Sequence, residues 1–206
     1  MPQTPSQILT EEAAGLDPLA FFQQWYADAQ TVGMVEPAAM ALATATPTGL
    51  PAVRIVLLRS FDKRGFVFFT NYLSRKGEEL DANPRAALAF YWAELERQVR
   101  IEGDIEKVSA EESDAYFHGR PIGHQLSALA SPQSQVIADR DVLELRMAEL
   151  VERFPHHKVP RPSHWGGYRL LPHTIEFWQG RESRLHDRLR FRKVSNGSWT
   201  RERLAP

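Results

Sequence analysis

The chain has 206 residues, of which 43% are hydrophobic and 25% charged, and its formal net charge is −1 at pH 7. This composition is typical of one globular domain, and the lack of a basic excess argues against a nucleic-acid partner. The absence of cysteine excludes disulfides, thiolate metal sites and thiol nucleophiles. No apolar run approaches the length of a membrane span and the start does not resemble a signal peptide, so we expect a cytoplasmic protein without a membrane partner.

The N-terminal residues predict an arm followed by a domain. Residues 1–16 are rich in Thr, Gln, Pro and Glu without apolar periodicity, and we expect them to form a flexible N-terminal arm. The remaining residues, 17–206, are expected to form a single domain. Its first helix is predicted to be capped by Asp17, to have Pro18 in its first position and to end at Gly33.

Strand patterns dominate much of the rest of the chain. Short runs of apolar and β-branched residues are separated by turns that contain Gly, Pro, Asn or Asp. Asn196-Gly197 between two such runs is a strong hairpin signal. The predicted strands cover residues 40–46, 52–61, 65–72, 86–92, 97–108, 168–171 and 174–179, followed by a final pair on either side of that turn.

Capping residues predict three further helices. They run from Ser74 to Asn83-Pro84, from the capping box of Ser109 and Glu112 to His118, and from Asp139 to Pro155. Residues 121–135 are too irregular to assign. Many strands with a few peripheral helices predict a mostly β protein of the α+β class, built on a small antiparallel barrel.

Several common chemistries lack their sequence motifs. There is no phosphate-binding G-x-x-x-x-G-K-[ST] loop, no dinucleotide-binding G-x-G-x-x-G and no G-x-S-x-G nucleophile elbow. The seven histidines do not form a spacing typical of metal ligands, and we expect no metal site. Any redox chemistry therefore requires a bound organic cofactor.

Basic residues cluster in a way that predicts an anionic ligand. Residues 178–193 contain five arginines and a lysine, and strand alternation places His186, Arg188, Arg190 and Arg192 on one face. Like charges on one face repel unless anions or water separate them. A charge-assisted hydrogen bond to phosphate contributes about 1.5–3 kcal/mol, whereas an exposed ion pair contributes at most about 1 kcal/mol. We therefore favour a partly buried anion over a solvated strand face. Further clusters are Arg54 with Arg59, Arg75 with Lys76, and Arg97 with Arg100.

Eight segments, taken in order, resemble the pyridoxine/pyridoxamine 5'-phosphate oxidase family. They are RIVLLR at 54–59, FFTNYLSRKGEEL from 68, LERQV at 95–99, YFHGRP at 116–121, SPQS at 131–134, WGGY at 165–168, EFWQG with RLHDR within 176–188, and the terminal RLAP. The resemblance implies a split β-barrel homodimer with peripheral helices and with FMN bound across the subunit interface. It also implies oxidation of pyridoxamine and pyridoxine 5'-phosphate to pyridoxal 5'-phosphate by hydride transfer to FMN, with O2 as acceptor and H2O2 as product.

The same resemblance implies roles for individual residues. Those implied to bind FMN are Arg54, Ile55, Val56, Leu57, Phe69, Thr70, Arg75, Lys76, Gln98, Gln133, Ser134, Trp178 and Arg188. Those implied to bind the phosphorylated substrate are Arg59, Tyr116, Arg120, His124, Arg184, Leu185 and His186. Of these, Arg184 and His186 are the expected catalytic residues, which orient the pyridine ring and handle protons.

Three features depart from the family pattern. Arg59 stands where the family usually has lysine, and His124 stands where it usually has a phosphate-binding serine. The N-terminal arm lacks the arginine and tyrosine with which the family's arm can cover the substrate. Two other functions remain open: a related flavin oxidase of the phenazine-biosynthesis type, acting on a larger unphosphorylated ring, and a non-catalytic protein that binds flavin or pyridoxal phosphate.

Overall fold

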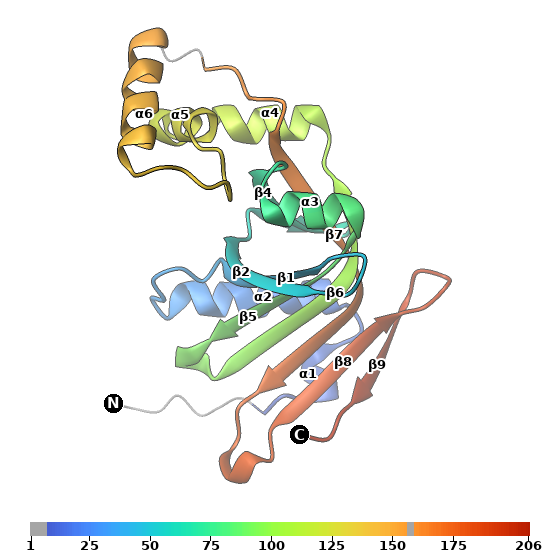
Figure 1. Ribbon diagram of the computed structural model, residues 1–206. Helices are drawn as coiled ribbons and strands as arrows, with labels where there is room; N and C mark the ends of the chain where they lie inside the picture. Colours follow the sequence, from blue (N-terminus) through green and yellow to red (C-terminus); the bar gives the residue numbers. More distant parts are fainter. Residues whose placement is uncertain (1–7, 156–158) are drawn as a thin grey trace.

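One curled antiparallel sheet forms the centre of the molecule (Figure 1). The computed structural model describes residues 8–155 and 159–206. The strands are β1 Ala39–Ala45, β2 Pro51–Leu57, β3 Ser60–Asp62, β4 Gly65–Asn71, β5 Arg85–Trp92, β6 Arg97–Lys107, β7 Trp165–Gln179, β8 Asp187–Lys193 and β9 Trp199–Arg203. They follow the order β2-β1-β5-β6-β7-β4-β3, with β8 pairing β7 and β9 pairing β8. The mostly β, α+β class predicted from the sequence is confirmed.

Helices cover the periphery of this sheet, as predicted. They are α1 Glu11–Ala14, α2 Pro18–Thr31, α3 Arg75–Ala82, α4 Ala110–His118, α5 Ile122–Ala130 and α6 Asp141–Arg153, with 3-10 turns η1 Ala93–Leu95 and η2 Glu182–Arg184. Helices α4, α5 and α6 lie together at one end of the molecule, and the β8–β9 hairpin lies at the other (Figure 1). Among the helices in the described ranges, none combines the length and apolar character needed to cross a membrane.

Local capping signals place several helices as the sequence predicts. The Asp17 side chain accepts hydrogen bonds from the backbone N–H groups of Leu19 and Ala20 at 2.9 and 3.2 Å. Ser109 and Glu112 form the reciprocal capping box at the start of α4. These side chains satisfy backbone donors that a helix leaves unpaired in its first turn.

Three elements of the domain differ from the sequence prediction. The run 52–61, predicted as one strand, divides into β2 and β3, which lie at opposite ends of the sheet order. Helix α5 lies within residues 121–135, which the sequence analysis left unassigned. Its N-cap is Pro121, which provides no side-chain capping bond and so gives no start signal in the sequence. Strand β7 is continuous where two strands were expected on either side of Pro172. The register of β6 against β7 shifts between Glu102 and Gly103, opposite Pro172, and such a bulge accommodates a proline in a sheet.

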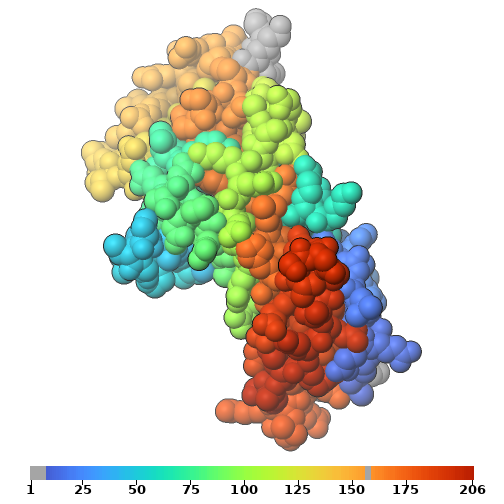
Figure 2. Space-filling view, turned by 90° about the vertical axis from the view of Figure 1, so that its right-hand side faces the viewer, coloured from blue at the N-terminus to red at the C-terminus, as the bar shows by residue number. Residues whose placement is uncertain are grey.

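The predicted flexible arm also differs from the structure in its last residues. Leu9 is buried, helix α1 is formed, and the Arg203 guanidinium pairs with the Glu11 carboxylate at 2.7 Å. Figure 2 shows the N-terminal residues beside the C-terminal strands. The arm prediction missed this because the partner, Arg203, is distant in sequence. Residues 1–7 lie outside the described residues.

Aromatic side chains form the centre of the core. Phe22 of α2 is fully buried, and its ring lies 4.9 Å from those of Phe61 and Phe66 and 5.3 Å from that of Phe90. A smaller apolar cluster beneath α4, α5 and α6 contains Phe117 and Trp165. This second cluster supports the helices that border the candidate site.

Candidate functional site

A cavity of about 550 Å³ opens between strands β2 and β4 and the loops and helices around α3, α4 and α5. Eleven residues predicted from the family resemblance line it: Ile55, Val56, Leu57, Arg59, Phe69, Thr70, Lys76, Tyr116, Arg120, His124 and Gln133. Gly119, Pro121 and Trp165 complete the lining. Strand β2 is at the end of the sheet order, so its outer edge offers backbone groups without a strand partner.

Arg54 and Arg75 lie beside the cavity and share one buried carboxylate. Glu79 Oε2 lies 2.9 Å from Arg54 Nη2, and Glu79 Oε1 lies 2.8 Å from Arg75 Nε. The Thr44 hydroxyl donates to the same carboxylate. Burial raises the pKa of Glu79, but hydrogen bonds from Thr44, Arg75 and Arg54 outweigh it and leave this pKa below its usual value. Glu79 therefore stays ionised and holds the two guanidinium groups together.

Lys76 provides a third positive charge, at the wall of the cavity. Its Nζ donates to Gln133 Oε1 at 3.0 Å, and the Thr70 hydroxyl donates to the same oxygen at 3.1 Å. Burial lowers the pKa of Lys76, and the nearby charge of Arg54 lowers it further. Ser134, the next residue after Gln133, adopts a positive φ of 71° and does not line the cavity.

A second basic group lies in the cavity around Arg120. Arg120 Nη1 is buried and has no hydrogen-bond partner among residues 8–155 and 159–206. Burial lowers the pKa of Arg120, and the charge of Arg59 acts in the same direction. Arg59 lies over the Tyr116 ring, with Cζ 6.0 Å from the ring centroid, and His124 lies on the same cavity wall. A buried cationic donor without a partner costs free energy, which a bound anion can recover.

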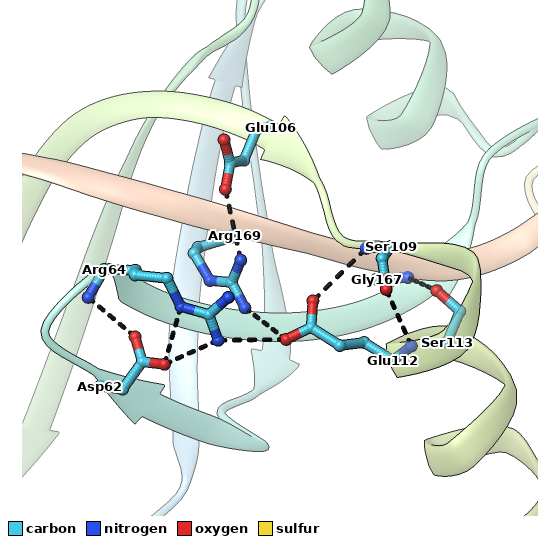
Figure 3. Close-up of polar contacts among 8 residues, drawn as sticks. All are labelled: Asp62, Arg64, Glu106, Ser109, Glu112, Ser113, Gly167 and Arg169. Carbon is cyan, nitrogen blue, oxygen red and sulfur yellow. Dashed lines mark hydrogen bonds and ion pairs between the residues drawn. The ribbon is translucent and has the colours of Figure 1, made fainter.

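An ion-pair network holds the start of helix α4 (Figure 3). The same helix carries Tyr116, which lines the cavity. The Glu112 carboxylate accepts hydrogen bonds from Arg169 Nη2 at 2.9 Å and from Arg64 Nη2 at 3.1 Å. Arg169 is buried and also pairs with Glu106 at 3.3 Å. Burial raises the pKa of Glu112, but the bonds from Arg169 and the other donors lower it below its usual value. The N-terminus of α4 is thereby fixed to β7 and to the β3–β4 turn.

A further group of predicted residues lies outside this cavity, near the start of β6, the end of β7 and the start of β8. Gln98 pairs in register with Trp178, and the Trp178 and His186 rings are 4.6 Å apart. His186 Nδ1 accepts a hydrogen bond from the Arg181 backbone N–H at 3.1 Å, which leaves Nε2 as the ring donor when the imidazole is neutral. The other members of this group are Arg184, with a positive φ of 60°, exposed Leu185, and Arg188. The end of β7 and the start of β8, which carry most of this group, lie toward the end of the molecule opposite α4–α6 (Figure 1).

Carboxylates account for part of the positive charge on β8. Arg190 and Arg192 both pair with Glu202 of β9, at 2.7 and 2.9 Å, and Arg188 pairs with Glu176 of β7 at 2.8 Å. The hypothesis that a bound anion explains the whole row is therefore wrong for Arg190 and Arg192. Their charge is partly neutralised by one carboxylate across the strands, a possibility that strand alternation within β8 alone did not reveal.

Two residues of the site were not identified from the sequence. Glu79 follows Arg75 at the i+4 spacing that brings helical side chains together, so that spacing was a usable signal. Trp165 opens the WGGY segment used for the family resemblance, but no role was assigned to it. Its position in the cavity wall depends on the pairing of β7 with β4.

Comparison with known proteins identifies two matching family descriptions. The sequence model for pyridoxamine 5'-phosphate oxidase matches residues 28–153. The model for the pyridoxine 5'-phosphate oxidase C-terminal dimerisation region matches residues 165–206. The second match contains Trp178, Arg184, Leu185, His186 and Arg188, which are the group outside the cavity except for Gln98.

Curated relatives match over nearly the whole chain. A pyridoxine/pyridoxamine 5'-phosphate oxidase from Microcystis aeruginosa is 58% identical over 198 residues, covering 96% of this chain and 92% of that protein. One from Ralstonia pickettii is 60% identical over 189 residues, covering 92% and 89%.

Solved structures match as well. PhzG from Burkholderia lata 383, in complex with tetrahydrophenazine-1-carboxylic acid, has a TM-score of 0.90 and 36% identity, covering 97% of this chain and 98% of that one. A pyridoxamine 5'-phosphate oxidase-related, FMN binding protein from Nostoc punctiforme has a TM-score of 0.74 at 18% identity, covering 93% and 100%, and shows likeness of fold.

Proposed function

The chain belongs to the pyridoxamine 5'-phosphate oxidase family, and on this premise we propose that it oxidises pyridoxamine and pyridoxine 5'-phosphate to pyridoxal 5'-phosphate with FMN as cofactor. The observation that carries the proposal is the buried, unpaired Arg120 Nη1 in a cavity that Arg59 and His124 also line. A phosphate ester supplies the acceptor oxygens that this donor lacks.

The other basic group fits the phosphate of FMN. Arg54, Arg75 and Lys76 lie at or beside the same cavity, and the β2 edge at Ile55, Val56 and Leu57 offers backbone groups to a flat polar ring. Two separate cationic groups suit two phosphate esters in one cavity. When bound, FMN supplies the redox chemistry by accepting a hydride from the substrate and passing the electrons to O2, which forms H2O2.

The residues of this chain bind and orient the substrate. Arg59, Arg120, Tyr116 and His124 hold its phosphate and so fix the position of the ring relative to the cofactor. Arg184 and His186 orient the pyridine ring, and the Nε2 proton of His186 is available to a substrate oxygen or nitrogen because Nδ1 is occupied by the Arg181 backbone.

Because Arg184 and His186 lie outside the cavity of their own chain, we assign them to the cavity of a second copy. The dimerisation region of the family covers both residues, and Leu185 between them is 71% exposed. Ile55, at the cavity, is 67% exposed. A homodimer that covers these apolar side chains brings Arg184 and His186 of one copy to the cavity of the other.

Two alternative functions are tested with the same preparation. The likeness to PhzG favours a flavin oxidase that acts on a larger ring, but the identity to that protein is 36%, against 58% and 60% for the phosphate oxidases. The cationic cavity also favours a phosphorylated substrate. Purified protein is expected to be yellow, to release FMN on denaturation, and to form H2O2 with both phosphorylated vitamers much faster than with the unphosphorylated ones. Bound flavin without peroxide would support a non-catalytic binding protein.

Heterodimers test the shared site. Arg120→Ala and His186→Ala subunits, co-expressed with different tags, form a heterodimer in which one site carries both changes and the other carries neither. The proposal expects about half of the wild-type activity in that heterodimer and little in either homodimer. If each site lies within one chain, the heterodimer contains no intact site and stays as inactive as the two parents.

A further inference from the structure

Arg120, in the cavity wall, is held differently from Arg54 and Arg75 beside the cavity. Arg54 and Arg75 rest on the Glu79 carboxylate, whereas the Arg120 side chain makes no hydrogen bond or ion pair within residues 8–155 and 159–206. Its guanidinium instead lies over the ring of Trp165, with Cζ 4.6 Å from the centroid. Phe117 is the next aromatic neighbour, at 5.8 Å.

Trp165 is a rigid support for this contact. It is 7% exposed and lies at the start of β7, where it pairs with Asn71 of β4. Its ring is nearly parallel to those of Phe69 and Tyr116, at 5.5 and 6.2 Å between centroids, and these two rings stack on each other at 4.0 Å. A side chain packed among parallel rings has little freedom to move away from Arg120.

We propose that Trp165 is the positioning residue for Arg120 and thereby sets the preference of this cavity for phosphorylated substrates, an inference that rests on the proposed function. An aromatic face attracts a guanidinium through its quadrupole and leaves the N–H donors free. A carboxylate in the same place would occupy those donors, neutralise the charge and repel a phosphate. The Trp165 ring fixes Arg120 without these losses, which explains why this half-buried arginine has a buried Nη1 without a hydrogen-bond partner among the described residues.

The test uses the holoenzyme with Trp165→Leu and Trp165→Phe. In Trp165→Leu, the KM for pyridoxamine 5'-phosphate and the inhibition constant of inorganic phosphate are expected to rise about tenfold, the range of a desolvated cation–π contact. Trp165→Phe keeps an aromatic face and is expected to raise both values about threefold. The kcat is expected to stay within about twofold of the wild-type value. The kcat/KM for unphosphorylated pyridoxamine is expected to remain unchanged, because neither constant depends on how tightly the cavity binds a phosphate group.

Two controls separate positioning from packing. Trp199→Leu removes a partly buried tryptophan of β9, outside the cavity lining, and is expected to leave every one of these constants unchanged. In an Arg120→Ala background, Trp165→Leu is expected to add no further rise in KM, since the group that it positions is already gone.

The outcomes distinguish this inference from the proposed function. Wild-type protein that fails to oxidise any phosphorylated vitamer overturns the proposed function itself. Active wild type with unchanged KM in both Trp165 variants overturns only the role of Trp165. Equal losses for phosphorylated and unphosphorylated substrates, or additive losses in the double variant, indicate a packing role and also overturn it. If Trp165→Leu does not fold, Trp165→Phe decides the question by the same criteria.

Discussion

Glu79 lies between Arg54 and Arg75, with one carboxylate oxygen on each guanidinium, at 2.9 and 2.8 Å. Together with Lys76, the group has three positive charges and one negative charge, which leaves a formal charge of +2. A phosphate monoester carries about −1.5 to −2 near neutral pH. The buried carboxylate thus holds two flexible cations in place and leaves the cluster with a charge that matches its proposed ligand.

Glu79→Gln is therefore expected to weaken FMN binding. Glutamine has the same size and accepts hydrogen bonds, but it loses the charge that holds both arginines, and charged hydrogen bonds are the stronger ones. We expect the Kd for FMN to rise by about tenfold and the Kd for riboflavin, which lacks the phosphate, to stay unchanged. Flavin fluorescence quenching on titration of the apoprotein measures both.

The neighbouring Glu78→Gln is the matched control, because Glu78 is exposed on the same helix and forms no ion pair within the described residues. Removal of a negative charge at either position changes the long-range potential in a similar way. If both variants bind FMN with the same Kd, Glu79 is not a positioning residue. If Glu79→Gln binds FMN more tightly than wild type, the Glu79 carboxylate repels the phosphate of FMN.

His124 lines the cavity together with Arg59 and Arg120 and can offer a ring N–H donor there. His124→Ala removes this donor and is expected to raise the KM for pyridoxamine 5'-phosphate by about threefold to tenfold, the range of one net hydrogen bond. His124→Ser keeps a hydroxyl donor and is expected to raise it less. Steady-state assays of the three proteins make the comparison. An unchanged KM in His124→Ala contradicts this role.

The fold was predictable from sequence where local interactions decide it. Asp17 and the Ser109–Glu112 pair cap their helices through bonds within four residues, and Asn196-Gly197 forms the last hairpin with Gly197 at a φ of 84°. Helix α5 was missed because Pro121 provides no capping bond. The continuous β7 was missed because the bulge beside Pro172 is defined only by the pairing of β7 with β6, which is far away in sequence.

The candidate site was likewise predictable only in part from the sequence. The family resemblance supplied the residue identities, and eleven of them line one cavity. Sequence did not reveal that Gln98, Trp178 and His186 lie apart from this cavity in one chain, because their position depends on the register of β6, β7 and β8. Nor did it identify Glu79 and Trp165, which contact the arginines at and beside the cavity.

The network around Glu112 is expected to contribute stability that acid removes. Hydrogen bonds hold the pKa of Glu112 and that of Asp62 below their usual values. A carboxyl whose pKa is lower in the folded than in the unfolded protein stabilises the fold above its unfolded pKa, and this contribution is lost as pH falls through the folded pKa. Glu112→Gln is therefore expected to lower the melting temperature most near neutral pH, with the difference from wild type shrinking toward about pH 3.

Thermal unfolding followed by circular dichroism measures this difference at each pH. Glu149→Gln, at an exposed position of α6 that forms no ion pair within the described residues, is the control and is expected to melt like wild type throughout. A Glu112→Gln effect that is constant with pH would assign the loss to packing or hydrogen bonding instead of charge.

Gly77→Ala is expected to disturb the cofactor site through the backbone. A Cβ at Gly77 would lie 2.1 Å from the Tyr72 carbonyl oxygen, so helix α3, which carries Arg75 and Lys76, would have to move. Overpacking of this kind costs about 1–3 kcal/mol, which exceeds the gain of at most about 1 kcal/mol from replacing a helical glycine with alanine. We expect a lower free energy of unfolding and weaker FMN binding. Gly123→Ala in α5, where a Cβ meets nothing within 4 Å, should be neutral or stabilising in the same denaturant titration. Equal stability of the two variants would show that α3 accommodates the added methyl group without displacing its basic residues.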